Sequence, residues 1–277
     1  MSSPEQESIT IHDGIHLEVA SFGSGEPLVL VCGTCQDHRL WVPLVPILAE
    51  RYRVITYNHR GIGDSDRGEE PISIASLAQD LEALLDALGI TRAHLLGWSL
   101  GSAVLQEIAL ARPDRVASLV LAFTWARTST YQRSLFSVLA HPWHNGNRAL
   151  GLAGLALAFS PELLESEQFG PLMTQFDAVF PSTPSQIATA AEQWNADLLH
   201  DADDRLPQIS APTLVIAGEQ DLLTPPSLGR RVADAIPNAR YELLTGPGSS
   251  HSAMLERPQE VAALILSFLG EHALESA

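Results

Sequence analysis

Hydrophobic and polar positions along this chain follow two periods that alternate, which predicts strands followed by helices. Strand-like segments occur at residues 27–32, 53–57, 93–98, 116–123, 213–218 and 240–244, and those at 27–32 and 116–123 are apolar enough for strands buried on both faces. Apolar residues at three- and four-residue steps predict a helix at residues 74–88, and further helices are expected at residues 41–50, 100–111, 227–236 and 258–269. This alternation predicts an α/β protein with a mostly parallel central sheet flanked by helices.

Two segments depart from the alternation. Near the start, Asp13-Gly14 separates two β-prone runs at residues 8–12 and 15–22, which predicts a hairpin. Residues 127–207 are mostly helical in pattern, with proline and glycine punctuation and no convincing strand. We therefore expect a core domain made of residues 1–126 and 208–277, with residues 127–207 inserted as a helical cap or lid.

Composition and charge exclude several classes of protein. With 45% hydrophobic residues the chain of 277 residues can bury a large core, as one domain with an insertion. Its net charge of −17 disfavours nucleic acid and anionic membrane surfaces as partners. The apolar run at residues 150–159 is shorter than the roughly 20 residues of a membrane span, so we expect a buried or pocket-lining helix there. The N-terminal residues do not resemble a signal peptide, which predicts a cytoplasmic protein.

The two cysteines, Cys32 and Cys35, are spaced C-x-x-C directly after a predicted strand. Such a pair can be a redox-active dithiol or half of a zinc site, but a zinc site needs about four ligands and the sequence has no second pair. We expect two packed thiols in a loop, and no metal or organic cofactor.

A serine stands in a Gly-x-Ser-x-Gly pattern at residues 97–101, between a predicted strand and a predicted helix. A sharp strand-to-helix turn would hold Ser99 in strained backbone geometry, and glycines two positions before and after it relieve the crowding. The Oγ would then project above the sheet, with the Leu100 N–H at the helix N-terminus directed to where an oxyanion forms. The pattern in this context indicates a nucleophilic serine.

His251 and Asp221 are the predicted partners of Ser99. A serine hydroxyl needs a base near neutral pH, and the base needs an orienting carboxylate. His251 follows the predicted strand at 240–244 and Asp221 follows the one at 213–218, so both belong at the carboxyl edge of the sheet with Ser99. Glu219 is the main alternative acid, and residues 124–126 after the preceding strand offer no carboxylate.

With these motifs the sequence resembles the α/β-hydrolase superfamily over nearly its whole length. Gly33-Thr34 is similar to the family's His-Gly oxyanion loop, although Cys32 stands where the family usually has histidine. Residues 58–65 resemble its Asp-x-Arg-Gly-x-Gly-x-Ser turn, and residues 211–221 and 251–258 resemble its acid and histidine segments. The resemblance implies an oxyanion hole made by the backbone N–H groups of Thr34 and Leu100, under a lid formed by residues 127–207.

The residues expected to line the substrate pocket, besides the catalytic ones, are Gly33, His38, Trp98 and Trp125. Gly33-Thr34 followed by Asp37 and Trp41 resembles enol-lactonases and small-ester hydrolases, whereas residues 37–39 resemble cofactor-free dioxygenases of the same fold. His38 is therefore expected at the pocket mouth, with a solvated loop histidine as the alternative. An epoxide hydrolase or dehalogenase would carry aspartate at position 99, so both are disfavoured.

The function expected from these residues is hydrolysis of a carboxylic ester or lactone through an acyl-enzyme on Ser99. The apolar character of the lid predicts a small, partly apolar substrate. Three alternatives stay on the same fold: carbon–carbon bond hydrolysis, haloperoxidase or perhydrolase chemistry, and cofactor-free oxygenation. A ligand-binding protein without turnover is an alternative of a different class. The oligomeric state is open, and a homodimer is one alternative.

Overall fold

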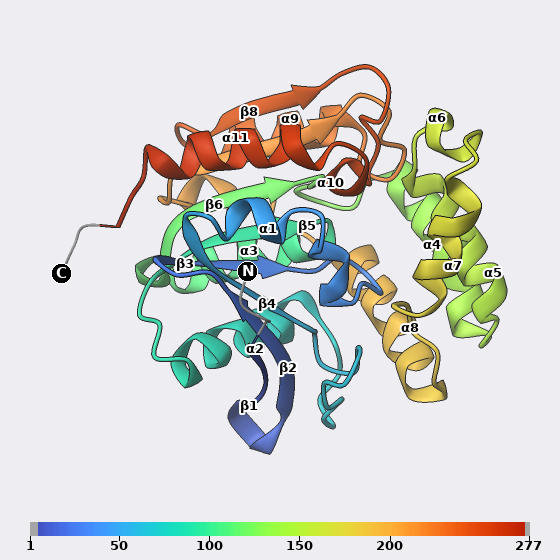
Figure 1. Ribbon diagram of the computed structural model, residues 1–277, viewed down its shortest axis with the longest axis horizontal. Helices are drawn as coiled ribbons and strands as arrows, with labels where there is room; N and C mark the ends of the chain where they lie inside the picture. The colour runs from blue at the N-terminus through green and yellow to red at the C-terminus, as the bar shows by residue number, and fades with distance from the viewer. Residues whose placement is uncertain (1–4, 275–277) are drawn as a thin grey trace.

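The computed structural model describes residues 5–274 and is built on one eight-stranded sheet with the order β1-β2-β4-β3-β5-β6-β7-β8 (Figure 1). The strands are β1 (Glu5–Thr10), β2 (His16–Phe22), β3 (Glu26–Val31), β4 (Tyr52–Tyr57), β5 (Ala93–Trp98), β6 (Val116–Ala122), β7 (Thr213–Gly218) and β8 (Arg240–Leu244). β1 pairs with β2 and β2 with β4 in antiparallel fashion, and the other neighbours are parallel. The predicted hairpin and the mostly parallel sheet are both confirmed.

Helices cover both faces of the sheet. They are α1 (Val45–Leu48), α2 (Ile74–Ala87), α3 (Leu100–Ala111), α9 (Pro226–Ala235), α10 (Ala253–Glu256) and α11 (Pro258–Gly270). In the strand order, the crossover from β3 to β4 runs towards β1, whereas the crossovers from β4 to β5, from β5 to β6 and from β7 to β8 run towards β8. Because parallel crossovers are right-handed, α1 lies on the face opposite to α2, α3 and α9. α11 contacts α1, and both lie in front of the sheet in Figure 1.

The middle of the sheet is the core of the molecule. Every residue of β5, β6 and β7 is buried, as expected for parallel strands with helices on both faces. The edge strand β8 is mostly half-buried. The carboxyl ends of β5, β6 and β7 therefore present their following loops from a rigid base.

One predicted helix is much shorter than expected. Residues 41–50 do not form a continuous helix: a 3-10 turn at His38–Trp41 is followed by the single turn of α1 at Val45–Leu48. Pro43 and Pro46 are the physical reason, because proline lacks the N–H that an interior helical position donates. Pro46 is tolerated because it lies in the first turn of α1, where that N–H is not needed.

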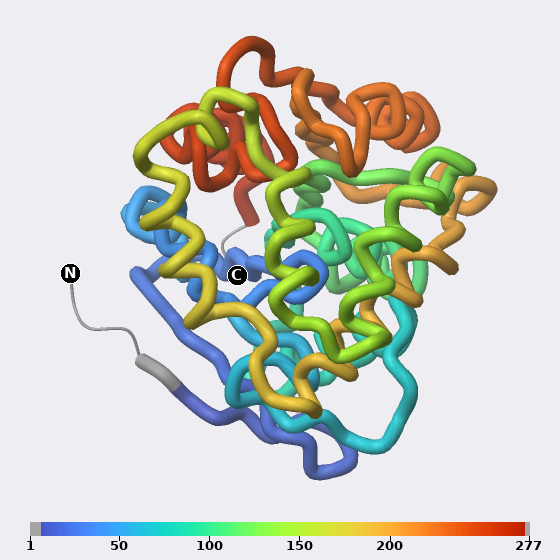
Figure 2. Tube along the Cα trace, turned by 90° about the vertical axis from the view of Figure 1, so that its right-hand side faces the viewer, coloured from blue at the N-terminus to red at the C-terminus, as the bar shows by residue number. Residues whose placement is uncertain are grey.

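Five α-helices lie between β6 and β7 and cover the carboxyl edge of the sheet (Figures 1 and 2). They are α4 (Thr130–His144), α5 (Arg148–Gly154), α6 (Pro161–Leu164), α7 (Phe169–Asp177) and α8 (Pro184–Leu199). Capping boxes at Ser129 and Thr183 start the two longest, α4 and α8. An isolated bridge between Arg127 and Asp201 joins the two ends of this segment. We call the segment between β6 and β7 the lid. Among residues 5–274, no helix combines the length and apolar character that crossing a bilayer requires.

Candidate active site

Ser99 occupies the turn between β5 and α3 with a backbone conformation that L-residues rarely adopt, φ 55° and ψ −119°. The turn is held by the Ser99 N–H, which donates to the Ala122 carbonyl of β6 at 3.0 Å. A Cβ at Gly101 would overlap the Val31 carbonyl oxygen, and one at Gly97 would overlap the Gly101 carbonyl. Both glycines of the motif are therefore required by close backbone packing, with the serine between them at the start of a helix.

His251 and Asp221 come from neighbouring loops and are in direct contact. His251 Nδ1 lies 2.9 Å from Asp221 Oδ2, and both side chains are buried. Asp221 also accepts bonds from the backbone N–H groups of Leu223 and Thr224, at 2.8 and 2.9 Å, and from the Thr224 hydroxyl at 2.6 Å. Each oxygen of the carboxylate thus has two partners.

The surroundings of Asp221 favour its ionised form. Burial by itself raises the pKa of the carboxyl, but the charge of His251 and the hydrogen bonds from His251 and Thr224 outweigh it, and the pKa is lowered overall. A permanently charged carboxylate at this position fixes the orientation of the imidazole and favours a proton on Nδ1. The other ring nitrogen, Nε2, is then the one available as a base.

Trp98 connects the serine turn to the histidine loop. Its indole N–H donates to the backbone carbonyl of His251 at 2.9 Å. The ring of Phe123, at the end of β6, lies 5.6 Å from the imidazole of His251. The histidine is therefore positioned by three of the loops at the carboxyl edge, and Trp98 has a structural bond as well as its predicted place in the pocket wall.

A pocket lies between this edge of the sheet and the lid, and Ser99, His251, Thr34 and Trp98 all line it. The lid contributes most of the apolar wall, including Leu155, Ala158 and six aromatic side chains: Phe136, Trp143, Phe159, Phe176, Phe180 and Trp194. The apolar run at residues 150–159 is divided between two faces. Its residues Gly151, Gly154, Leu155, Ala158 and Phe159 line the pocket, whereas Leu150 and Leu157 are exposed on the outside.

The loop after β3 is held to the lid at the residue expected to supply an oxyanion N–H. The Thr34 hydroxyl donates to Asp197 Oδ2 of α8 at 2.6 Å, and the next N–H, that of Cys35, donates to Gln193 Oε1 of α8 at 2.7 Å. Cys35 has a positive φ of 63°, so the loop is sharply bent at this point. Leu100, the other predicted donor, is the first residue of α3 and follows Ser99 directly.

Three residues predicted to line the pocket lie elsewhere. Trp125 is fully buried beside Phe136 and His200, with its N–H bonded to the Thr128 hydroxyl. Gly33 donates its N–H to Gln36 Oε1 at 2.7 Å, and the side chain of Gln36 lines the pocket in its place. Both residues follow strands of the sheet, β3 and β6, but a position after a strand does not by itself place a residue at the cavity.

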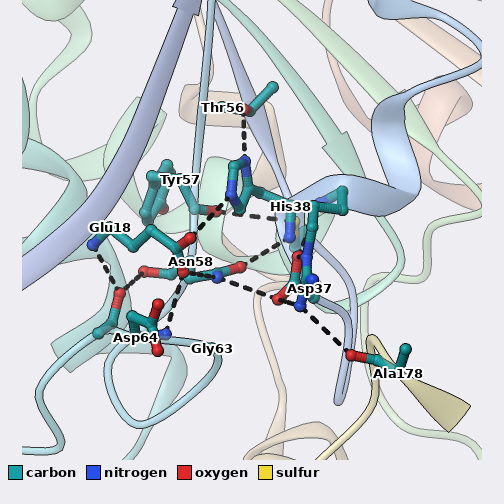
Figure 3. A network of polar contacts seen from close by, with 12 residues as sticks. Glu18, Asp37, His38, Thr56, Tyr57, Asn58, Gly63, Asp64 and Ala178 are labelled. Carbon is teal, nitrogen blue, oxygen red and sulfur yellow. Dashed lines mark hydrogen bonds and ion pairs between the residues drawn. The ribbon is translucent and has the colours of Figure 1, made fainter. Parts of the chain in front are cut away.

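His38 is the third; it is buried in a polar network (Figure 3) and is not among the residues that line the pocket. Its Nδ1 lies 2.8 Å from the Thr56 hydroxyl and its Nε2 lies 3.5 Å from a Glu18 carboxylate oxygen. The interaction with His38 is the main reason that the pKa of Glu18 is lowered to about 2. The expected place at the pocket mouth is therefore wrong, and so is the solvated alternative.

The two cysteines are free and buried. Cys32 Sγ accepts a bond from the Trp41 indole N–H at 3.2 Å, and burial raises the pKa of both thiols far above the usual range. Within residues 5–274 no group of three or more His, Cys, Asp or Glu side chains is arranged to hold a metal ion. The packed-thiol interpretation agrees with this burial.

Asp197 is a pocket residue that the sequence analysis missed. It is 1% exposed, and burial raises its pKa to about 8 although the bond from Thr34 acts in the opposite direction. The available signal was its spacing on the helix: Asp197 follows Ala190 and Trp194 by seven and three residues, so it shares their apolar face. An acidic residue on such a face indicates a site.

Comparison with known proteins agrees with this architecture. The sequence model of the α/β-hydrolase fold family matches residues 26–258. A protein of Azorhizobium caulinodans named RutD, assigned as a carbamate hydrolase, is 32% identical over 257 residues, which is 90% of this chain and 93% of RutD. The crystal structure of the enol-lactonase from Burkholderia xenovorans LB400 has a TM-score of 0.86 at 28% identity and covers 95% of this chain and all of its own.

A third relative carries a different reaction in its name. BpoC of Mycobacterium tuberculosis H37Rv, assigned as a non-heme bromoperoxidase, is 33% identical over 269 residues, covering 92% of this chain and 97% of BpoC. The chain therefore belongs to the α/β-hydrolase superfamily of enzymes. Relatives with three different named reactions mean that the reaction of this member has to be argued from its own site.

Proposed function

We propose that this protein is a serine hydrolase that cleaves a carboxylic ester or lactone through an acyl-enzyme on Ser99. The observation that carries the proposal is the meeting of two independent features at one pocket. A serine in a strained strand-to-helix turn and a histidine bonded to a buried carboxylate both line the same cavity. Together they are the parts of a nucleophile and its base.

In the proposed reaction His251 Nε2 takes the proton of Ser99 Oγ as the oxygen attacks the acyl carbonyl. The tetrahedral oxyanion accepts hydrogen bonds from the backbone N–H groups of Thr34 and Leu100. Each such donor contributes about 10²–10³ to the rate in hydrolases of this kind. The intermediate collapses, and the alcohol leaves with the proton from His251. A water molecule deprotonated by His251 then attacks the acyl-serine, and Ser99 regains its proton as the acid departs.

The pocket wall favours a substrate with apolar parts. Most of its side chains are aromatic or aliphatic, and neither lysine nor arginine occurs among the described residues that line it. A substrate carboxylate would find no countercharge there, and the strongly negative chain would also repel it in solution. Uncharged esters, lactones and carbamates therefore fit the pocket better than acidic ones.

The test is hydrolysis of p-nitrophenyl acetate and butyrate, δ-valerolactone and a p-nitrophenyl carbamate, by the wild type and Ser99→Ala. Release of product that Ser99→Ala lacks, with an unchanged melting temperature, is the expected result. A fluorophosphonate probe should add its mass to the peptide that contains Ser99. Ser118→Ala, which removes another buried hydroxyl on the neighbouring strand β6, is the matched control and should keep the activity.

Two results would contradict the proposal. Turnover that persists in Ser99→Ala would exclude an acyl-serine. Absence of any Ser99-dependent product or probe labelling in folded wild type would favour the carbon–carbon hydrolase, peroxidase, oxygenase or binding alternatives. A dienoate substrate, a halogenation assay and oxygen consumption would then distinguish among these.

A further inference from the structure

Asp197 differs from every other residue around the pocket. Of the described residues lining the cavity it is the only one with an acidic side chain, and it projects from the lid helix α8 among aromatic neighbours. Burying a carboxyl group in such a wall is unfavourable, because the group loses its hydration without gaining a charged partner. A carboxyl group retained at that position is expected to have a partner.

The structure supplies a partner for only one of its two oxygens. Oδ2 is bonded to the Thr34 hydroxyl at 2.6 Å, whereas Oδ1 is buried without a hydrogen-bond partner among the described residues. Buried polar atoms in folded proteins are hydrogen-bonded in the great majority of cases. An unpaired oxygen on a residue that lines a ligand pocket is therefore expected to be paired by the ligand.

The partner should be uncharged. The titratable groups near Asp197 are His251 across the pocket and the thiol of Cys35 on the adjacent loop, and neither lysine nor arginine is among the described lining residues. Burial raises the pKa of Asp197 to about 8, so at neutral pH the carboxyl is mostly protonated and can both donate and accept. Such a group can form a hydrogen bond with a hydroxyl or a keto oxygen of the substrate. It does not favour the binding of a substrate carboxylate.

Its position also indicates which part of the substrate it meets. Asp197 is bonded to the side chain of Thr34, the residue whose N–H is proposed to hold the oxyanion, so it lies beside the scissile carbonyl. The leaving oxygen must face His251, which protonates it, so the acyl chain extends away from the histidine. The acyl chain is therefore the part of the substrate that lies beside Asp197.

We propose, resting on the serine-hydrolase function above, that Asp197 and Thr34 form a polar subsite for a hydroxyl or keto group two or three bonds from the scissile carbonyl of the substrate. The substrate class is then a hydroxy- or oxo-acyl ester, or the corresponding lactone, with an otherwise apolar chain. The subsite selects among acyl groups because an analogue without the polar group leaves Asp197 unpaired.

The experiment compares three p-nitrophenyl esters of nearly equal size: butyrate, 3-hydroxybutyrate and the anionic hemisuccinate. Wild type should favour 3-hydroxybutyrate over butyrate in kcat/KM by about ten-fold or more and use the hemisuccinate worst. In Asp197→Leu the ratio of the first two should fall to about one, whichever way the absolute rates move. Asp197→Asn, which keeps a donor and an acceptor, should retain most of the preference. Thr189→Val, which removes another buried hydroxyl of α8, should leave the ratio unchanged.

The outcomes separate this assignment from the proposed function. A wild-type ratio near one, a preference for the hemisuccinate, or a ratio that survives Asp197→Leu would overturn the subsite while leaving the hydrolase intact. If none of the three esters shows Ser99-dependent turnover, the proposed hydrolase function is contradicted instead. The subsite would then be tested by binding alone: 3-hydroxybutyramide should raise the melting temperature of the wild type more than butyramide does, and Asp197→Leu should remove that difference.

Discussion

The floor and the roof of the pocket are built on opposite principles. In the floor, at the carboxyl edge of the sheet, the Asp221 carboxylate has two hydrogen-bond partners on each oxygen and His251 is bonded at both ring and backbone. In the roof, formed by the lid, the wall is aromatic and its one acidic group, within the described part of the pocket, has an unpaired oxygen. The comparison indicates that the floor is complete without substrate, whereas the roof is completed by it.

The difference follows from how each region is held. Ser99 and Asp221 follow β5 and β7, inner strands that are paired on both sides. His251 follows the edge strand β8, and its bonds to Trp98 and Asp221 fix its position instead. The roof is joined to the floor by separate hydrogen bonds instead of strand pairing, such as the Tyr131 hydroxyl on the Leu222 carbonyl at 2.7 Å and the Ser252 N–H on the Ala158 carbonyl at 2.9 Å. We therefore expect substitutions in the floor to change rate, and substitutions in the roof to change selectivity.

The largest effect is expected when the floor loses its charge. Asp221→Asn should lower kcat by about 10³–10⁴, because an amide in place of the carboxylate stabilises neither the imidazolium nor the required tautomer of His251. Steady-state hydrolysis of p-nitrophenyl butyrate checks this. Glu219→Gln is the control, because Glu219 is exposed and binds the Gly246 N–H, and it should keep nearly full activity. The reverse order of effects would make Glu219 the orienting acid.

A smaller effect is expected where roof and floor meet. Gln193→Leu removes the acceptor of the buried Cys35 N–H, so the loop that carries Thr34 should lose about 1–3 kcal/mol of support. We expect kcat to fall by about ten-fold with a smaller change in KM. Gln193→Glu keeps an acceptor oxygen and should restore most of kcat. If kcat is unaffected in the leucine variant, the lid does not position the oxyanion loop.

Trp98→Phe tests the bond between the serine turn and the histidine loop. Phenylalanine keeps most of the ring but loses the N–H that binds the His251 carbonyl, so we expect about 1 kcal/mol less stability and a few-fold lower kcat. Chemical denaturation and steady-state kinetics measure the two quantities. Trp41→Phe removes a neighbouring buried indole N–H, bonded to Cys32, and should reduce stability without lowering kcat. Equal loss of kcat in both variants would argue against a specific role for Trp98.

The smallest expected effect concerns the roof and its dependence on pH. The folded protein keeps the proton of Asp197 up to about pH 8, whereas the unfolded chain releases it near the ordinary aspartate pKa of about 4. The folded state thus binds more protons in this window, and its stability declines as the pH rises from about 4 to 8. Asp197→Asn does not titrate, so its melting temperature relative to wild type should increase by about 3 °C or more between pH 5 and pH 8. A difference that stays constant with pH would show that Asp197 is ionised in the folded protein.

Much of the fold could be predicted because local patterns and long-range packing agree. The strands β5, β6 and β7, which were predicted from their sequence pattern, are buried along their whole length. The Ser99 pattern lies at a turn that requires both glycines. The helix expected at residues 41–50 was wrong because Pro43 and Pro46 lack the N–H that a continuous helix needs. His38 and Trp125 were misplaced because both lie in turns beyond β3 and β6, where side-chain direction depends on tertiary hydrogen bonds that the pattern does not contain.

What the sequence determined by itself was the class of fold and the order of its chemical groups: a serine at a glycine-flanked turn, then an acid and a histidine after later strands. These follow from local backbone requirements, so they can be recognised in a few residues. The tertiary structure alone decided that Asp197 is placed against Thr34 although 163 positions separate them, and that Gln36 rather than Gly33 faces the pocket. The physical reason is that the hydrogen-bond partner and the burial of a side chain are set by the packing of the lid on the sheet, which no local pattern specifies.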